Sequence, residues 1–348
     1  MDFTLRALEP TDGPALDALL SSQALSTAVA ITTHYRYDVA ASLIAQHPNL
    51  YGVVATAPGI DGLVGMATAF IDEVQVEGRL YPCAHLENLK VHQDVRRMGL
   101  GRRLAEWRIA EARRRFGGPG VIAAGVEATN EGSLATAGKW AGQILGPLRI
   151  LIATTTRRAP ALGVLTVRPM EDTDIDAVVE GSNAFHDDTN LYTRMTAEKL
   201  RAWIAPLDPG GPVRQYHVAL TPAGSVVAGV LVMQRYELMT DQIERLPRPL
   251  AVLNKVVHVV PADGVIRTVE VCLPWFAPGQ LEAGRRLWEQ IRYTWHDRAS
   301  NVGAVVDPKS EASAMCQVGR SFAPRLRLMV PIASPVSLDA SKPLSVWR

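Results

Sequence analysis

Residues 85–107 read "HLENLKVHQDVRRMGLGRRLAEW", and this stretch decides the fold. Its first seven residues are typical of a strand, in which successive side chains point to opposite faces of a sheet. The two predicted faces are His85, Glu87, Leu89 and Val91 on one side and Leu86, Asn88 and Lys90 on the other. A helix is predicted over residues 99–116, because Leu100, Leu104 and Trp107 recur at helical spacing.

The turn between strand and helix combines two glycines with a cluster of arginines, in the order Arg96-Arg97-Met98-Gly99-Leu100-Gly101-Arg102. The first N–H groups of a helix have no partner within the helix, and the helix dipole attracts anions. Glycine lets the backbone approach a ligand closely, and the guanidinium of arginine suits phosphate. The turn predicts a phosphate or pyrophosphate cradle, with an ordinary turn and solvated arginines as the alternative. Its spacing matches neither the dinucleotide-binding G-x-G-x-x-G pattern nor the Walker A pattern.

The spacing Arg96-x-x-Gly99-x-Gly101, after a strand and at the start of a helix, resembles motif A of the GNAT superfamily of N-acetyltransferases. The segment "VEATNEGSLATAGK" (residues 126–139) is similar to motif B of that family. The resemblance covers residues 3–154 in outline. It implies an α/β fold, with a mixed, centrally splayed β-sheet flanked by helices, and acetyl-CoA as the cofactor.

The resemblance also assigns cofactor-binding residues by their place in the motifs. Backbone groups near the strand end would contact the pantetheine arm, motif A would hold the pyrophosphate, and two residues of motif B would face the cofactor. The expected residues are Leu89, Lys90, Val91, Arg96, Arg97, Met98, Gly99, Leu100, Gly101, Arg102, Asn130 and Ser133.

Acetyl transfer to an amine is helped by a base, because an alkylammonium with a pKa of about 10.4 is almost fully charged at pH 7. The resemblance places candidate bases on the strand, where some family members carry theirs. We expect Glu87 to act as the base through a water molecule, with His85 as its partner or alternative. The structural interpretation of the same residues is a hydrogen-bonded core His85 and an ion-paired Glu87.

One position departs from the family pattern. Many members carry a tyrosine in motif B that protonates the leaving thiolate, whereas this half of the chain has no tyrosine after Tyr81. The expected function is acetylation of a primary amine on a small molecule, with a place in secondary metabolism as one setting. Two alternatives stay open, namely a weakly catalytic or non-catalytic acyl-CoA-binding or sensing protein, and a protein-lysine acetyltransferase.

Several sequence echoes occur in the same order in the two halves of the chain, which predicts a duplicated domain. For example, "TLRALEPTD" (residues 4–12) resembles "TVRPMEDTD" (residues 166–174), and "GRRLAEW" (residues 101–107) resembles "GRRLWEQ" (residues 284–290). We expect two tandem GNAT folds that form a pseudo-dimer within one chain. The expected boundaries are 1–155 for the acetyl-CoA-binding domain, 156–165 for a linker, 166–335 for the C-terminal domain and 336–348 for a tail.

The C-terminal half lacks the motif A spacing. In "FAPGQLEAGRRLWEQ" (residues 276–290), an alignment that puts Gln280 in place of the first arginine puts Arg285 at the second glycine. A long side chain there would crowd a pyrophosphate, and Pro274 and Pro278 disturb the end of the preceding strand. We therefore expect a degenerate GNAT fold, which completes the acceptor cleft or stabilises the first domain.

The composition is that of an ordinary globular protein, with 348 residues, of which 47% are hydrophobic and 20% charged. The net charge of +1 offers no general attraction to nucleic acid or to an anionic membrane. Three widely spaced cysteines and the absence of paired histidine spacing argue against a disulfide framework and a metal site. No signal-peptide pattern or membrane-length apolar stretch is found. We expect a cytoplasmic protein, either monomeric or homodimeric, without nucleic-acid or membrane partners.

Overall fold

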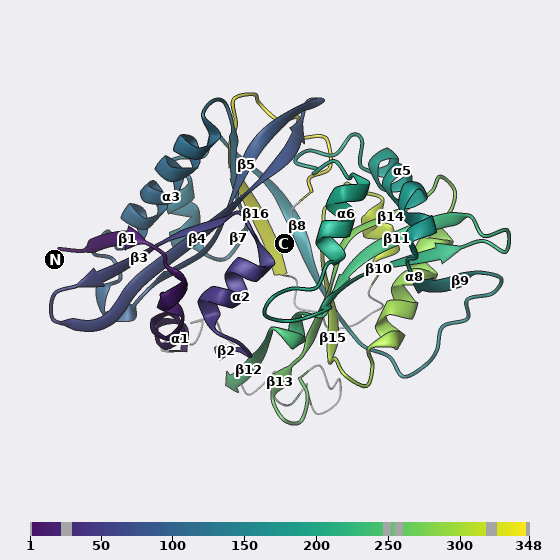
Figure 1. Ribbon diagram of the computed structural model, residues 1–348, viewed down its shortest axis with the longest axis horizontal. Coiled ribbons are helices and arrows are strands. Elements are labelled where there is room, and N and C mark those ends of the chain that lie inside the picture. Colours follow the sequence, from purple (N-terminus) through teal and green to yellow (C-terminus); the bar gives the residue numbers. More distant parts are fainter. Residues whose placement is uncertain are drawn as a thin grey trace. The chain divides into compact units, whose positions relative to one another are not determined.

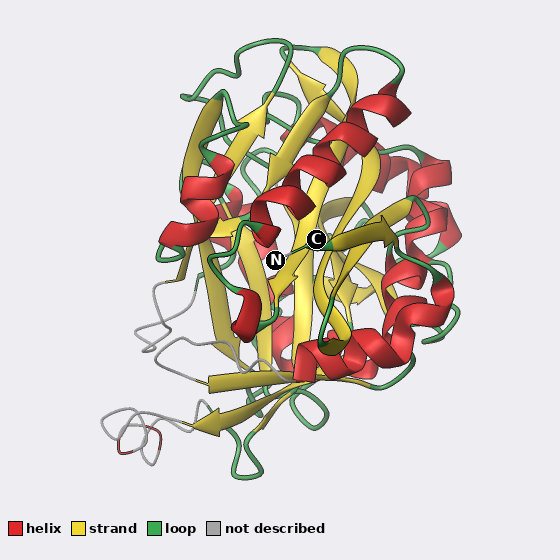
Figure 2. Cartoon of the chain, turned by 90° about the vertical axis from the view of Figure 1, so that its left-hand side faces the viewer, coloured by secondary structure: helices red, strands yellow, loops and turns green. Residues whose placement is uncertain are grey.

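The computed structural model describes residues 2–21, 30–245, 252, 254, 260–317 and 326–345. Helices and strands both occur throughout the chain and are drawn in red and yellow in Figure 2. The sheets contain both parallel and antiparallel strand pairs. The expected mixed α/β fold class is therefore confirmed.

The chain folds into two compact units that are not consecutive stretches of sequence. The units consist of Met1–Pro147, Asp241–Pro247 and Leu328–Leu338 for the first, and of Leu148–Thr240, Arg248–Arg327 and Asp339–Arg348 for the second. The limits of these units differ from the boundaries expected at residues 155 and 335. The reason is strand pairing, because a strand near the C-terminus completes the first unit and a strand from the first half extends into the second.

The first unit contains the elements up to the middle of β8. Its helices and 3-10 turns are η1 (Pro10–Asp12), α1 (Gly13–Ser21), α2 (Val39–Gln46), η2 (Gln93–Val95), α3 (Leu100–Phe116) and α4 (Glu131–Ala137). Its strands are β1 (Thr4–Ala7), β2 (Ala30–Tyr35), β3 (Leu50–Ala57), β4 (Ile60–Val76), β5 (Arg79–Val91), β6 (Val121–Ala124) and β7 (Val126–Glu127), joined by most of β12 (Met239–Arg245) and β16 (Leu326–Ala333).

The second unit begins within β8. Its helices and 3-10 turns are η3 (Asp172–Asp174), α5 (Ile175–Phe185), α6 (Ala197–Ile204), η4 (Arg235–Glu237), α8 (Leu281–Thr294) and α9 (Ala312–Met315). Its strands are β8 (Gln143–Thr154), β9 (Thr166–Pro169), β10 (Arg214–Leu220), β11 (Val226–Met233), β13 (Val265–Ile266), β14 (Thr268–Phe276) and β15 (Asn301–Val306).

Both units have the same strand order. In the first, β1, β3, β4 and β5 are antiparallel, β5 pairs in parallel with β6, and β6 pairs antiparallel with β16. In the second, β9, β10, β11 and β14 are antiparallel, β14 pairs in parallel with β15, and β15 pairs antiparallel with β8. The parallel pair arises because a strand that returns through a helix, here α3 or α8, runs in the direction of the first strand. The shared order confirms two tandem folds of one kind.

Helices cover both faces of the sheet in the first unit (Figure 1). On one face, Leu16 of α1 and Val39 of α2 pack in a cluster with Met66 of β4. On the other face, Leu100 and Leu104 of α3 pack against β3 and β4. Burial of each such side chain contributes about 1.5–3 kcal/mol relative to exposure. The strand β5 therefore presents one face to α1 and α2 and the other to α3.

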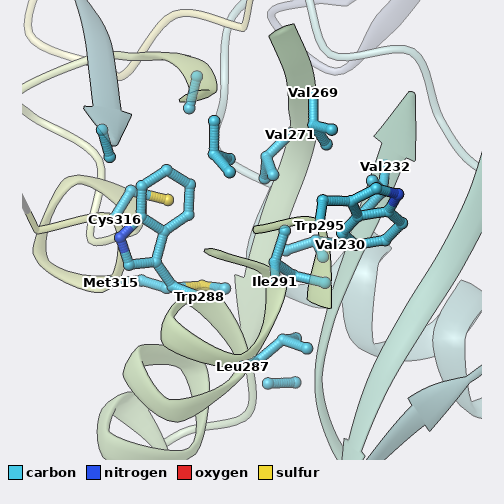
Figure 3. Close-up of a cluster of buried hydrophobic side chains, with 14 of the residues drawn as sticks. Val230, Val232, Val269, Val271, Leu287, Trp288, Ile291, Trp295, Met315 and Cys316 are labelled. Atoms are coloured by element: carbon cyan, nitrogen blue, oxygen red, sulfur yellow. The ribbon is translucent and has the colours of Figure 1, made fainter. Parts of the chain in front are cut away.

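In the second unit, α8 packs on its sheet in the same manner, as Figure 3 shows. Leu287, Trp288 and Ile291 recur at helical spacing on α8 and are fully buried. They form one cluster with valines of β11 and β14, namely Val230, Val232, Val269 and Val271. The helix stripe is thus preserved in the half whose motif A spacing is lost.

In each unit the same ion pair joins the edge strand, β1 or β9, to the 3-10 turn that follows it, which explains one of the sequence echoes. In the first unit, Arg6 donates hydrogen bonds to Asp12 at 2.6 and 2.8 Å. The same carboxylate accepts a bond from the backbone N–H of Glu9 at 2.8 Å. In the second unit, Arg168 donates to Asp174 at 2.6 and 3.1 Å. The hydrogen bond from Arg6 is the main reason that the pKa of Asp12 is lowered.

Replacing Asp12 by Asn is expected to destabilise the protein by about 1–3 kcal/mol at neutral pH, because charge-assisted hydrogen bonds are lost. Since the pKa of Asp12 is lowered in the folded state, its contribution is present above the unfolded-state pKa and disappears as the pH falls through the folded-state pKa. Chemical denaturation at neutral and acidic pH measures this, with the exposed Asp17→Asn as the control. If the loss in free energy of unfolding caused by Asp12→Asn is as large at acidic pH as at neutral pH, the prediction is wrong.

Candidate functional site

The strand β5 carries one extra residue where it pairs with β4. Met66 lies opposite Lys90. Two residues further along β4, Thr68 lies opposite Glu87, which is three residues from Lys90. The extra residue forms a β-bulge at Asn88, which has a left-handed φ of 49° and donates from its side-chain amide to Thr68 Oγ1 at 3.0 Å. Such a bulge re-aims side chains and interrupts the hydrogen-bond ladder.

The bulge corrects the predicted faces of this strand. His85 stacks on Phe70, and Glu87 lies on the same face, toward α1 and α2. Leu89 and Val91 instead pack in the cluster formed with α3. The prediction that these four residues of β5 share one face is therefore wrong. The extra residue shifts the alternation, so side chains after the bulge point away from those before it.

A buried arginine of α3 holds the bulge. Arg108 Nη1 donates to the carbonyl oxygen of Thr68 at 2.8 Å and to that of Glu87 at 2.5 Å, one on each strand of the interrupted pair. Burial lowers the pKa of Arg108 to about 10, so its guanidinium stays charged at neutral pH. Tyr51 donates to the backbone carbonyl of Arg108 at 3.1 Å and ties this turn of α3 to β3. The side chain therefore supplies hydrogen bonds where the bulge interrupts the ladder.

Three rings are stacked beside Glu87. His47, which follows α2, lies with its ring centroid 3.9 Å from that of Phe70, and the planes differ by 8°. The His85 ring stacks on Phe70 as well, at 4.7 Å and 17°. Because both imidazoles are parallel to it at stacking distance, Phe70 lies between them. His47 also approaches the carboxylate, with 3.9 Å between its Nε2 and Glu87 Oε2.

His85 is a neutral ring in the core of the first unit. Burial lowers its pKa to about 4, although the charge of Asp72 acts in the opposite direction. Within the part of the chain that the structure describes, its Nε2 has no hydrogen-bond partner. The structure thus brings His85 to the same face as Glu87, as predicted, but in a state that favours shaping the site over exchanging protons with water.

The sheet opens beside the end of β5. Pairing with β6 covers Cys83–Leu86, whereas β5 continues to Val91. Backbone groups of Leu89 and Val91 therefore lie beyond the β5–β6 ladder, in the splay that the resemblance implied. The Val91 carbonyl accepts a hydrogen bond from Arg96 Nε at 3.3 Å. Lys90 lies on the face toward α1 and α2, the same face as Glu87, whereas it was predicted on the opposite face. Burial is the main cause that lowers the pKa of Lys90, and the charge of Arg96 is a smaller one.

The turn before α3 leaves helix N–H groups without an intrahelical acceptor. Gly99 has a left-handed φ of 84°, and its carbonyl accepts the first helical bond, from the Arg103 N–H at 3.2 Å. The N–H groups that precede this bond belong to Leu100, Gly101 and Arg102, and no described side chain caps the helix. Together with the helix dipole they form an end that attracts an anion.

The two glycines of the turn are needed for different reasons. Gly99 needs its left-handed φ, which residues with a side chain rarely adopt. Gly101 lies inside the helix, where an added Cβ would meet Val91 at an ordinary distance of 3.7 Å and no other described atom within 4 Å. The packing of the chain therefore does not require a bare backbone at Gly101. Close approach of a phosphate group would require it, so the turn fits the predicted cradle.

The side chains at this end are mostly exposed and positive. The exposed ones belong to Arg96, Arg97, Met98 and Arg102. Arg102 Nε lies 3.7 Å from the Glu106 carboxylate, one turn further along α3. Leu100 is buried in the core, so its backbone is the part that a ligand can reach.

Motif B residues have a local structural role. Asn130 is the N-cap of α4, and its side-chain oxygen accepts a hydrogen bond from the Ser133 N–H at 3.1 Å. This bond satisfies one of the unpaired N–H groups of the helix. The predicted contacts of Asn130 and Ser133 with a cofactor stay a prediction.

Sequence reasoning missed two residues that shape the site, His47 and Arg108. Arg108 offered a signal, because it follows Leu104 by four residues and so lies on the apolar stripe of α3. His47 offered none, since its contacts with Phe70 and Glu87 exist only in the folded chain.

The second unit repeats the bulge and the glycine turn, but the N-terminal end of its helix α8 differs from that of α3. The bulge of β14 lies at Leu273, with φ 47°, and Gly279 has φ 76° before α8 begins at Leu281. Arg285 therefore lies in the second turn of α8, and the alignment that placed it at the second glycine is wrong. Glu282 lies in the first turn, where the dipole stabilises its carboxylate but the carboxylate repels an anion.

Among the residues that the structure describes, no group of three or more His, Cys, Asp or Glu side chains is placed to hold a metal ion. No described helix has the length and apolar character needed to span a membrane.

Comparison with known proteins agrees with this geometry. Residues 17–142 match the sequence model of the acetyltransferase (GNAT) family. No curated protein matches the chain in sequence.

Solved structures resemble the chain over nearly its whole length. The N-myristoyltransferase of Saccharomyces cerevisiae with bound myristoyl-CoA gives a TM-score of 0.64 at 14% identity, covering 99% of this chain and 89% of that one. A GCN5-related N-acetyltransferase from Sphaerobacter thermophilus gives 0.58 at 15% identity, covering 97% and 98%. A tandem GNAT protein from the clavulanic acid biosynthesis pathway gives 0.57 at 14% identity, covering 97% and 100%. At these identities the similarity establishes the fold.

Replacing Arg108 by Met is expected to destabilise the protein by about 1–3 kcal/mol, because a buried and a partly buried carbonyl group lose their charged donor. Arg108→Lys, which keeps a charged donor, should lose less. Urea denaturation measures both, with the exposed Arg113→Met of the same helix as the control. Equal stability of Arg108→Met and Arg113→Met would show that the bulge does not depend on the guanidinium.

Proposed function

We propose that the part of the chain that matches the GNAT acetyltransferase family, residues 17–142, transfers an acetyl group from acetyl-CoA to a primary amine on a small molecule. The proposal rests mainly on the N-terminal end of α3. There Gly101 adds no side chain beside the N–H groups that have no intrahelical acceptor. The likeness to a fold with bound myristoyl-CoA supports an acyl-CoA as the ligand.

The residues that would hold acetyl-CoA lie along one path. Backbone N–H groups of Leu100, Gly101 and Arg102 would bind the pyrophosphate, with the exposed guanidinium groups of the turn around it. Backbone groups of Leu89 and Val91, in the splay beyond the β5–β6 ladder, would bind the pantetheine arm. When bound, acetyl-CoA supplies a thioester carbon that a neutral amine can attack.

Glu87 is the proposed base. Its side chain is 28% exposed and lies directly before the bulge, with its backbone carbonyl fixed by Arg108. A carboxylate at this position can take a proton from an ammonium, directly or through one water, before the nitrogen forms its new bond. His85 and Phe70 would form the wall beside it.

A non-catalytic acyl-CoA-binding or sensing role is the second candidate. It is favoured by the lack of a tyrosine after Tyr81 in the first half of the chain, because no such group is then available to protonate the thiolate. Release of free thiol from acetyl-CoA, measured with a panel of amines, separates the two roles. Binding without amine-dependent thiol release would support the second candidate and overturn the first.

Replacing Gly101 by Asp is expected to weaken acetyl-CoA binding by about 100-fold, because a carboxylate would replace a phosphate among the N–H groups and repel it. The same substitution should leave the free protein as stable as the wild type or slightly more so, since an acid in the first turn favours the helix dipole. Calorimetry should find one site per chain in the wild type, because Glu282 already occupies the equivalent end in the second unit.

The matched control is Gly101→Ala, which adds a Cβ without charge in a place where the chain has room for it. Its binding should lie between those of the wild type and Gly101→Asp. If Gly101→Asp binds acetyl-CoA as tightly as the wild type, the turn does not bind the pyrophosphate, and the proposed acetyl-CoA site is wrong.

Replacing Glu87 by Gln is expected to lower kcat by about 10²–10⁴-fold at neutral pH, because the amide cannot accept the proton of the ammonium. The deficit should shrink as the pH rises toward the amine pKa of about 10.4, where the free amine no longer needs a base. Acetyl-CoA affinity should stay unchanged. The exposed Glu73→Gln on β4 is the control, and equal kcat values in the two variants would exclude Glu87 as the base.

A further inference from the structure

Acetylation of an ammonium leaves one proton to be discarded in every turnover. The ammonium gives up one proton before attack, the nitrogen then bonds to the acetyl carbon, and the carbon–sulfur bond breaks. The nitrogen loses a second proton, and the thiolate, whose conjugate thiol has a pKa of about 8.5, takes up one of the two at neutral pH. The other must reach the solvent, so a carboxylate that collects it has to be discharged before the next cycle.

His47 is the group placed to receive that proton. Its Nε2 lies 3.9 Å from Glu87 Oε2, a separation that a small side-chain movement or one water can bridge. The two side chains are 17% and 28% exposed, so both reach the surface of the first unit. Imidazole is the side chain best suited to accept and release a proton near neutral pH.

The position of His47 is held from three directions. Its N–H donates to the carbonyl of Leu43 at 3.3 Å, at the end of α2. Its carbonyl accepts from the N–H of Leu50 at 2.8 Å, at the start of β3. Its ring lies flat on Phe70, 3.9 Å between centroids. The imidazole is therefore presented to Glu87 by the fold.

His85 is less suited to this task, although it lies on the same face. Its ring is buried behind Phe70, and burial keeps it neutral at pH 7. The charged groups in this region include Glu87, Arg108 on the α3 side of the bulge, and Asp72 near His85. Of the two histidines stacked on Phe70, His47 is the one with access to both carboxylate and solvent.

We infer that His47 accepts the proton collected by Glu87 and passes it to water, and so acts through Glu87 rather than on the amine. This inference rests on the proposed acetyl transfer. The inference gives the segment after α2 a part in the reaction, although this segment belongs to neither motif A nor motif B.

The test compares His47→Ala and His47→Phe in the full chain, with an amine that the wild type acetylates. Both variants should lose kcat on the order of tenfold, less than the loss for the base itself, with acetyl-CoA affinity unchanged. His47→Phe keeps a ring on Phe70, so a loss there reports the missing nitrogen rather than missing packing. Added imidazole should restore turnover in His47→Ala, which has room for it, and not in His47→Phe or Glu87→Gln.

The outcomes separate this inference from the function on which it rests. Wild-type kcat in His47→Phe would overturn the inference while leaving acetyl transfer intact. A loss in both variants with no rescue of His47→Ala by imidazole would also overturn it, because the role of His47 would then be structural. Failure of the wild type to acetylate any amine would instead overturn the proposed function.

Discussion

The hydrogen bonds from the buried guanidinium of Arg108 to the carbonyls of Thr68 and Glu87 are the constraint on which the candidate site depends. An extra residue in a strand interrupts the ladder, and a buried carbonyl left without a donor costs about 1–3 kcal/mol. Arg108 removes that cost from the α3 side, so the opposite side of β5 stays available for Glu87. Without the bulge, Leu89 would follow Glu87 onto the same face, and the face that packs on α3 would lose it.

The bulge also makes the side chains before and after it on β5 point to opposite faces of the sheet. Before it, the side chains of His85 and Glu87 meet the rings of Phe70 and His47 under α1 and α2. After it, the apolar side chains turn toward α3, and the backbone runs past the end of β6 toward the anion-attracting turn. Proton chemistry therefore belongs to side chains on one face, and donor binding to backbone groups at the strand end. A strand of thirteen residues can serve both only because its alternation is broken once.

The sequence was a good guide to local geometry and a poor one to geometry that depends on pairing. The glycine spacing predicted a turn that opens a helix, and Gly99 has the left-handed φ that such a turn needs. The echoes predicted two tandem folds, which the common strand order confirms. The bulge was not predictable, because alternation alone cannot reveal a residue that has no partner on the next strand. Arg285 was misplaced because the alignment through Gln280 implied a later helix start than the observed one, at Leu281. His47 reaches Glu87 only through tertiary packing, and the limits of the compact units follow strand pairing rather than the repeat.

The exchange of strands between the halves has a consequence for the order of events during synthesis. Strand β6 of the first unit pairs with β16, through Ala123 with Ile332 and Ile122 with Ala333. The ribosome makes β16 long after β6, so one edge of β6 stays unpaired until β16 emerges. An open strand edge is a template for wrong partners, including neighbouring nascent chains. Although domains usually mature in the order in which they are made, the half that carries the candidate site cannot finish its sheet until the other half has been synthesised. The half that carries the candidate site therefore depends on a strand from the other half, and a cut between the halves would leave this edge of β6 unpaired.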